Sequence, residues 1–229
     1  MNSSSLSLRK KAFEGLAQFL VALGALLFLP AWSLHYWQGW VFWLEFSVLV
    51  TLITAYFLKT DPALIERRLK AGPGAEKEKS QKVIQLFANI LFILLIVFPA
   101  LDHRFRWSHL GLALVVTGDL LVFFGLVIVF FVFKENSYTS GVIEVGEEQS
   151  VISTGPYRLV RHPMYAGAML LIIGIPLALG SSWGMLFCVP LAAAIVWRLV
   201  EEEKYLRRNL PGYVEYCAKT HSRLIPGIY

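Results

Sequence analysis

The sequence predicts an all-α integral membrane protein, a polytopic helix bundle of about six transmembrane helices. Hydrophobic residues make up 56% of its 229 residues, and charged residues make up 16%. Soluble domains carry about 25% charged residues, so this chain has too few charges for a soluble protein of its size. Several apolar runs approach the roughly 20 residues with which a helix crosses a bilayer. We therefore expect one membrane domain with small polar appendages, and the lipid bilayer as a partner.

Six hydrophobic segments give the order of the predicted membrane helices. They cover residues 12–29, 40–58, 83–100, 110–133, 164–179 and 183–199. Tryptophans lie near several segment ends, as in the aromatic belts of membrane proteins. The first segment lacks a small-residue cleavage site after it, so we expect a retained helix rather than a signal peptide. Only residues 180–182 join the last two segments, which predicts an antiparallel hairpin.

Basic residues on the connections predict the orientation. They cluster before the first segment, between residues 59 and 82, and between residues 204 and 223, whereas residues 30–39 and 180–183 contain none. The positive-inside rule places these three clusters in the cytosol, which requires an even number of spans. We expect six spans, with five as the alternative. The short N-terminus and compact size are typical of a prokaryotic inner-membrane protein.

Two connections carry predictions of their own. Asp61-Pro62 followed by residues 63–70 predicts a capped, basic helix on the membrane surface, broken by the Gly72-Pro73-Gly74 turn. Residues 134–160 lack helical periodicity, and long irregular segments are usually functional or disordered. Because this segment leads into the most polar part of the chain, we expect it to be functional.

Other patterns exclude several classes of protein. Cys188 and Cys217 are isolated in the sequence, so neither a metal site nor a disulfide framework is expected. No basic run alternates with aromatic residues, which argues against nucleic acid as a partner. No Gly-x-Gly-x-x-Gly turn is present, so a soluble dinucleotide-binding fold is not expected. We also expect no metal at His35, His103 and His109, which lie in or near the extracytoplasmic connections.

Polar residues gather just before the fifth segment, in the stretch GPYRLVRHPMYAG at residues 155–167. Proline is favoured at the first position of a helix, so the fifth helix should begin at Pro163, directly after His162. The unpaired N–H groups at such a helix end are electropositive. Polar groups at membrane depth are costly to keep, which favours a functional role for this stretch.

A second polar group ends the sixth segment and consists of Arg198 and the glutamates at 201–203. Arg198 and Glu202 are four residues apart and therefore share one face of the helix. Taken alone, Arg198 could snorkel to the membrane surface above a solvated helix end. The predicted hairpin, however, brings this group to the same side of the membrane as residues 155–167, and together they favour a site.

These motifs resemble those of the isoprenylcysteine carboxyl methyltransferase family, to which the phospholipid N-methyltransferases are related. The resemblance lies in Gly-Pro-Tyr at 155–157, Arg-His-Pro-x-Tyr-x-Gly at 161–167, Arg-x-x-Glu-Glu at 198–202, and the tail Gly-Tyr-x-x-Tyr…Arg-Leu-Ile-Pro-Gly at 212–227. It is specific over residues 134–229, which would form the catalytic region. Residues 1–133 would form four N-terminal membrane helices, where Asp61-Pro62 and Arg67-Arg68 are similar to many bacterial members. One departure is Glu144, where many relatives have glutamine.

The resemblance implies a membrane methyltransferase that uses S-adenosylmethionine and whose active site, formed by a loop and the C-terminal helical tail, faces the cytosol. Arg198 would bind the substrate, Glu202 would bind the polar end of the cofactor, and Arg161 would belong to the site without a defined role. The remaining residues that the resemblance assigns to the cofactor are Gln149, Ser150, Val151, Ile152, Tyr157, His162, Pro163, Met164 and Tyr165.

The residues themselves fit this chemistry. The sulfonium of S-adenosylmethionine is a permanent cation, which the Glu202 carboxylate and the ring faces of Tyr157 and Tyr165 could hold. A carboxylate acceptor is already ionised at neutral pH and needs no general base. A thiol or amine acceptor would need one, for which His162 or Glu201 would be the nearest candidates. The sequence leaves this choice open for a lipophilic or small acceptor.

Two other functions remain open from the sequence. Some sterol reductases have a C-terminal half that resembles this fold, which would imply NADPH as the cofactor. A membrane scaffold without catalytic activity is the other. Glu45 and Asp119 lie in the middle of the second and fourth segments, where carboxylates are rare and often mark polar pathways. Their role is not predicted.

Overall fold

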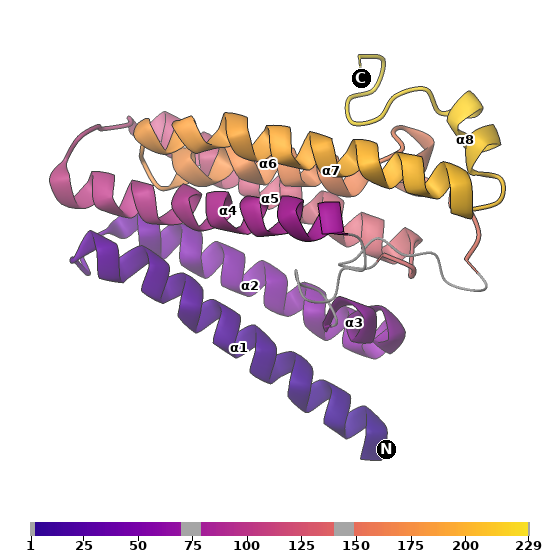
Figure 1. Cartoon of the computed structure of the whole chain (residues 1–229). Helices are drawn as coiled ribbons and strands as arrows, with labels where there is room; N and C mark the ends of the chain where they lie inside the picture. Colours follow the sequence, from indigo (N-terminus) through magenta and orange to yellow (C-terminus); the bar gives the residue numbers. More distant parts are fainter. Residues whose placement is uncertain (1–2, 70–78, 140–148, 229) are drawn as a thin grey trace.

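The structure is a computed structural model that describes residues 3–69, 79–139 and 149–228, and all regular elements within these ranges are helical. Figure 1 shows an elongated bundle of long helices. The long helices are α1 (Ser3–Ala31), α2 (Trp37–Thr60), α4 (Lys79–Phe105), α5 (Leu112–Glu135), α6 (Pro163–Ala178) and α7 (Cys188–Asn209). The short ones are α3 (Pro62–Leu69), α8 (Tyr213–Lys219) and the 3₁₀ helices η1 (Gly155–Arg158) and η2 (Trp183–Phe187). The predicted all-α fold class is confirmed.

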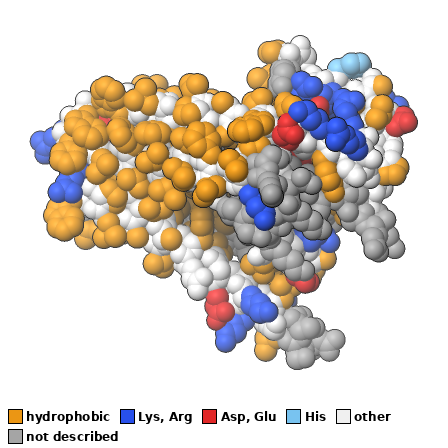
Figure 2. Space-filling model, viewed as in Figure 1, with side chains coloured by type: hydrophobic (Ala, Val, Ile, Leu, Met, Phe, Trp, Pro, Cys, Tyr) orange, Lys and Arg blue, Asp and Glu red, His pale blue; other side chains and the backbone are white. Residues whose placement is uncertain are grey.

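Within the described residues, five helices are long and apolar enough to cross a membrane: α1, α2, α4, α5, and α7 together with η2. Figure 2 shows hydrophobic side chains over most of the bundle surface and charged side chains gathered near its ends. The fifth predicted segment, residues 164–179, corresponds to α6, which has 16 residues. At 1.5 Å per residue it is about 24 Å long, somewhat less than the hydrocarbon core of a bilayer. It nevertheless runs from one end of the bundle to the other, antiparallel to α5 (Figure 1).

Glycines allow α5 and α6 to approach each other closely. A Cβ atom at Gly118 would lie 2.1 Å from the backbone nitrogen of Ala178, and one at Gly125 would lie 2.9 Å from the carbonyl oxygen of Gly167. Small residues serve this purpose in many membrane helix pairs. The close packing of α5 against α6 therefore depends on these glycines.

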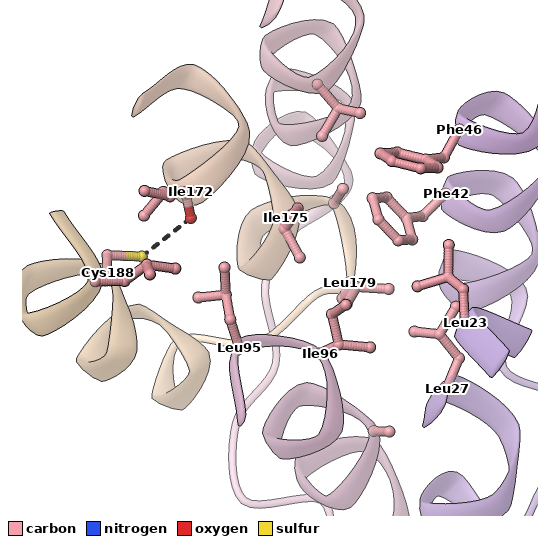
Figure 3. Packing of buried hydrophobic residues seen from close by; sticks show 14 of the residues in the cluster. Leu23, Leu27, Phe42, Phe46, Leu95, Ile96, Ile172, Ile175, Leu179 and Cys188 are labelled. Carbon is pink, nitrogen blue, oxygen red and sulfur yellow. Dashed lines mark hydrogen bonds between the residues drawn. The ribbon is translucent and has the colours of Figure 1, made fainter. Parts of the chain in front are cut away.

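The main core joins α1, α2, α4, α5, α6 and α7 in the middle of the bundle. Figure 3 shows Leu23 and Leu27 of α1 and Phe42 and Phe46 of α2 facing Ile96 of α4 and Leu179. On the other side of this layer, the Cys188 thiol donates a hydrogen bond of 3.2 Å to the carbonyl oxygen of Ile172 (Figure 3). The isolated cysteine is thus a packing residue of the core.

Several predicted boundaries agree with the structure and others differ. Helix α6 begins at Pro163 with His162 as its N-cap residue, and the Asp61 carboxylate caps α3 by accepting a 3.0 Å hydrogen bond from the backbone N–H of Leu64. Helix α1 begins at Ser3 rather than Ala12, because the basic first turns are helical as well. The last hydrophobic segment begins as the 3₁₀ helix η2 and becomes α-helical only at Cys188. The predicted turn at residues 72–74 and Glu144 lie outside the described residues.

The two ends of the bundle differ in structure. At one end, a second apolar cluster around Ala12, Phe57, Leu64 and Phe133 ties α3 to α1, α2 and α5. The C-terminal segment with α8 lies at this same end (Figure 1). The opposite end consists of the tight connections between α1 and α2, α4 and α5, and α6 and η2. All of the polar groups predicted to form a site lie at the first end.

Candidate functional site

A cavity of about 400 Å³ lies where α5 ends, α6 begins and α7 leaves the bundle. Its walls combine the irregular strip before η1, the first turn of α6, the last turns of α7, and α8. Every residue assigned to the site from the sequence lines this cavity: Gln149, Ser150, Val151, Ile152, Tyr157, Arg161, His162, Pro163, Met164, Tyr165, Arg198 and Glu202. The structure thus brings the two sequence motifs together around one space.

Glu203 is the centre of a buried ionic network beside the cavity and is only 4% exposed. Its Oε1 atom accepts a 2.7 Å hydrogen bond from Nε of Arg161 and lies 3.2 Å from Nε2 of His162. Its Oε2 atom accepts a 3.1 Å hydrogen bond from Nε of Arg223. A buried carboxylate needs such partners to offset the loss of water. Glu203 therefore links α7, the start of α6 and the C-terminal tail.

Arg161 holds the C-terminal tail against the motif. Its Nη1 atom donates 2.8 Å hydrogen bonds to the carbonyl oxygens of Thr220 and His221. The backbone continues the contact, since the N–H groups of Arg161 and His162 donate to the carbonyl oxygens of Ser222 and Arg223, both at 3.0 Å. These bonds close one wall of the cavity with residues that follow α8.

One face of α7 carries both Arg198 and Glu202 toward the cavity, as their spacing predicts. Glu202 accepts a hydrogen bond at Oε2 from the hydroxyl of Tyr165. Arg198 donates a 3.3 Å hydrogen bond from Nη1 to Oε1 of Gln81, a buried residue of α4. A cationic group and an anionic group are thus presented one helical turn apart within the same cavity.

Three tyrosines outside the long helices shape the wall formed by η1 and α8. The Tyr216 hydroxyl donates a 2.6 Å hydrogen bond to the carbonyl oxygen of Tyr157, and the Tyr157 hydroxyl accepts one of 3.0 Å from Nδ2 of Asn136. Burial raises the pKa of Tyr216 to about 12 and raises the pKa values of Tyr157 and Tyr213 further. All three phenols therefore stay protonated at neutral pH and present uncharged ring faces to the cavity.

The N-terminal half also contributes to the cavity. The predicted division into membrane helices at 1–133 and a catalytic region at 134–229 does not include this contribution. Arg68 of α3 and Gln85 of α4 belong to its lining. The Arg68 guanidinium lies over the ring of Phe133, 5.1 Å from its centroid. Burial lowers the pKa of Arg68, the nearby Tyr165 opposes this shift, and Arg198 adds to it. A second arginine therefore stands near Arg198 at the floor of the site.

Some residues of the candidate site and of its ionic network could be found from the sequence and others could not. Tyr213 and Tyr216 belong to the Gly-Tyr-x-x-Tyr part of the tail, and Arg68 to the Arg67-Arg68 pair, so a motif marks each of them. No motif identifies Glu203. Helical spacing turns its side chain away from Glu202, and its position near the end of α7 predicts exposure to solvent. Glu201, in contrast, lies outside the cavity lining and pairs with Lys204 at 2.6 Å.

Comparison with known proteins places these elements in a wider context. A family model described as phospholipid methyltransferase matches residues 113–211, which run from the start of α5 to the end of α7. A probable protein-S-isoprenylcysteine O-methyltransferase of rice, Oryza sativa, is 28% identical over 140 residues, which are 56% of this chain and 66% of the rice protein. The chain thus spans just under two thirds of that relative.

Two further relatives come from a plant and a bacterium. Protein-S-isoprenylcysteine O-methyltransferase B of Arabidopsis thaliana is 26% identical over 151 residues, which are 61% of this chain and 68% of that protein. The cobalt-zinc-cadmium resistance protein CzcN of Cupriavidus metallidurans is 30% identical over 76 residues, or 32% of this chain and 35% of CzcN. The family match over α5 to α7, which covers less than half of the chain, and these relatives support the resemblance to the isoprenylcysteine carboxyl methyltransferase family that the motifs predict.

Proposed function

We propose that the protein is an integral-membrane methyltransferase that transfers a methyl group from S-adenosylmethionine to the carboxylate of a lipophilic or small acceptor. The observation that carries this proposal is the convergence of Glu202, Arg198 and the cavity-lining tyrosines around one space of about 400 Å³. This volume falls within the range of about 300–1,000 Å³ that is typical of small-molecule sites. The anion, the cation and the aromatic faces are the groups that the two reactants require.

The cavity lining fits S-adenosylmethionine group by group. When bound, this cofactor supplies a methyl carbon attached to a sulfonium cation. The Glu202 carboxylate offers the negative charge for a cationic group, and the uncharged rings of Tyr157 and Tyr213 offer faces for cation–π contact or stacking. Residues 149–152 would hold the cofactor along their backbone, with His162–Tyr165 forming the wall at the start of α6. Arg161, bound to Glu203 and the tail, would keep that wall in place.

The surroundings of the candidate bases favour a carboxylate acceptor. A thiol or an amine must lose a proton before or during methyl transfer, which calls for a general base. Glu201 is outside the cavity and paired with Lys204, and Nε2 of His162 faces the carboxylate of Glu203. An ionised carboxylate needs no base, and Arg198 can orient it through charge-assisted hydrogen bonds. Orientation of this kind can supply roughly 7–11 kcal/mol of a reaction barrier.

The position of the site supports a cytosolic reaction with an acceptor that comes from the bilayer. The end of the bundle that carries the cavity also carries the basic N-terminus of α1 and Arg207 and Arg208 of α7, in agreement with the positive-inside rule. Residues 134–229 would supply most of the catalytic region, completed by Arg68 and Gln85. A prokaryotic inner membrane stays a prediction from the sequence.

Calorimetry with the purified full chain tests the cofactor. Wild type should bind S-adenosylmethionine saturably, and Glu202→Gln should weaken binding by at least tenfold because a charge-assisted contact is lost. Glu215→Gln is the matched control, since it removes the same charge from an exposed position of α8. Equal binding by both variants, or no binding by wild type at millimolar cofactor, would refute the assignment. NADPH binding in its place would indicate the reductase.

Product analysis separates the possible acceptors. A carboxylate acceptor gives a methyl ester that alkali hydrolyses, whereas methylated thiols and amines are stable to the same treatment. The family match to phospholipid methyltransferase makes the phospholipid amine the alternative to test alongside. An alkali-stable product would overturn the carboxylate assignment and leave the methyltransferase assignment intact.

A further inference from the structure

A second cavity, of about 900 Å³, lies at the end of the bundle opposite the candidate site. Three connections form it: α1 to α2, α4 to α5, and α6 to η2. Its lining includes Arg104 and Arg106 and the aromatic residues Trp32, Trp37 and Trp107. None of these residues has a part in the proposed methyl transfer.

The acidic residue beside this cavity is already hydrogen-bonded within the fold. Asp102 is the one acidic residue in the three connections and in the helix ends that they join, and it is only 1% exposed. Its Oδ1 atom accepts a 2.7 Å hydrogen bond from the backbone N–H of Ser108, and its Oδ2 atom accepts hydrogen bonds from the hydroxyls of Ser108 and Ser181. The Asp102 carboxylate is thus committed to holding two connections together.

The cations at the rim are not paired with carboxylates of the described residues. Arg104 lies over the ring of Trp32, 5.5 Å from its centroid, and over the ring of Phe105 at 5.3 Å. Among the residues that the structure describes, no carboxylate forms an ion pair with Arg104 or Arg106. The rim therefore carries two positive charges, of which aromatic faces position that of Arg104, and no carboxylate of the described residues pairs with either of them.

The backbone at the rim adopts a conformation that side chains rarely accept. Trp32 has φ of 51° and Arg106 has φ of 56°, and these are the only non-glycine residues with positive φ among those described. Such conformations are unusual for bulky residues, and they cluster where a function requires a particular geometry. Both belong to the lining of this one cavity, which aims an aromatic and a cationic side chain at its rim.

We infer that this cavity binds the negatively charged headgroup of an anionic phospholipid in the leaflet opposite the candidate site. Trp32, Trp37 and Trp107 are 75%, 47% and 49% exposed, as expected for tryptophans at the level of lipid headgroups. Two guanidinium groups match a phosphate, for which arginine is well suited. A zwitterionic headgroup is a poorer match, because its cation would need a carboxylate or an aromatic face. The Asp102 carboxylate is buried, and Arg104 already lies over the Trp32 ring. The bound lipid would brace the three connections.

Native mass spectrometry of the purified full chain tests this inference with phosphatidylglycerol and phosphatidylcholine of identical acyl chains. Wild type should retain phosphatidylglycerol preferentially. The double variant Arg104→Gln, Arg106→Gln should bind it roughly 30-fold more weakly, because each basic side chain near an anionic headgroup contributes about a fivefold effect. Arg9→Gln with Arg207→Gln is the control, since it removes two exposed arginines from the other end of the bundle.

Three results would overturn the lipid site. They are equal retention of both lipids by wild type, unchanged phosphatidylglycerol binding by the Arg104 and Arg106 variant, and displacement of the lipid by millimolar inorganic phosphate. The last would indicate a site for free phosphate. The comparison of two lipids on wild type does not depend on whether the variants fold. The outcome is also independent of the proposed methyl transfer, because binding is measured without the cofactor.

Discussion

Replacement of Glu203 by glutamine should release the C-terminal tail from the motif at the start of α6. The variant keeps the size of the side chain and removes its negative charge, which leaves the buried Arg161 without its carboxylate partner. The glutamine amide would present to Arg223 either its NH₂ group, which cannot accept a hydrogen bond, or its oxygen, which is a weaker acceptor than a carboxylate. The tail and the motif would then lose the ionic centre that joins them.

The size of this effect follows from the hydrogen bonds at Glu203. Two charge-assisted bonds, from Arg161 at 2.7 Å and from Arg223 at 3.1 Å, are lost or weakened. Such bonds contribute about 1.5–3 kcal/mol each, and breaking a buried ion pair costs about 3–5 kcal/mol. We expect about 3 kcal/mol for the free energy of tail docking, because the second oxygen still accepts a hydrogen bond. This corresponds to an increase on the order of 100-fold in opening of the tail.

Hydrogen exchange measured by mass spectrometry reports this opening directly. The backbone N–H groups of Arg161 and His162 donate to the carbonyl oxygens of Ser222 and Arg223, so their protection requires a docked tail. In Glu203→Gln these amides should exchange about 100-fold faster, while amides in the middle of α5 should be unchanged.

Glu201→Gln is the matched control for this measurement. It lies two residues away on the same helix, and its carboxylate is 29% exposed and paired with Lys204. Exposed pairs contribute about 0–1 kcal/mol, so exchange at Arg161 and His162 should change by less than about fivefold. Equal exchange in Glu201→Gln and Glu203→Gln would refute the claim that Glu203 holds the tail.

Three further predictions concern packing, the tyrosine wall and the floor of the site. Gly118→Ala should lower the free energy of unfolding by about 1–3 kcal/mol or more, because its Cβ would meet the backbone of α6. Gly111→Ala is the control and should be nearly neutral, because a Cβ at Gly111 has open space. Equal unfolding midpoints of the two variants in denaturant would contradict this prediction. Tyr216→Phe should lower the free energy of unfolding by about 1 kcal/mol, because the hydrogen bond to Tyr157 is lost. Tyr56→Phe, at an exposed position, should leave it unchanged, and thermal unfolding of both variants tests this difference. Arg68→Gln should raise KM for an anionic acceptor at least tenfold with little change in cofactor affinity; an unchanged KM would remove Arg68 from the acceptor site.

The sequence predicts the helices well because hydrophobic segments in a membrane protein have few alternatives. All six segments correspond to helices, and the Asp61 cap and the start at Pro163 follow from local chemistry alone. The boundaries fail where polar residues continue a helix, as in the first turns of α1 and in α7 down to Asn209. Hydrophobicity marks the part of a helix that lies in lipid, and it does not mark where the helix ends.

The candidate site could be predicted in part for a similar reason. The hairpin and the spacing of Arg198 and Glu202 are enough to bring the two motifs together. The burial of Glu203 depends on where residues 220–223 dock, and no local pattern determines that position. The contribution of Arg68 depends on how α3 packs against Phe133, which is likewise a long-range contact. Residues that meet only through tertiary packing are those that the sequence did not reveal.

Transfer of a labelled methyl group tests the central claim most directly. Purified full-length protein would be incubated with methyl-labelled S-adenosylmethionine and a small S-prenylated cysteine that has a free carboxylate. We expect a lipophilic product whose label alkali releases, formed by wild type and by Glu215→Gln, and reduced at least 100-fold in Arg198→Gln. No labelled product from wild type with both reactants at saturating concentration, or equal product from Arg198→Gln, would contradict the account.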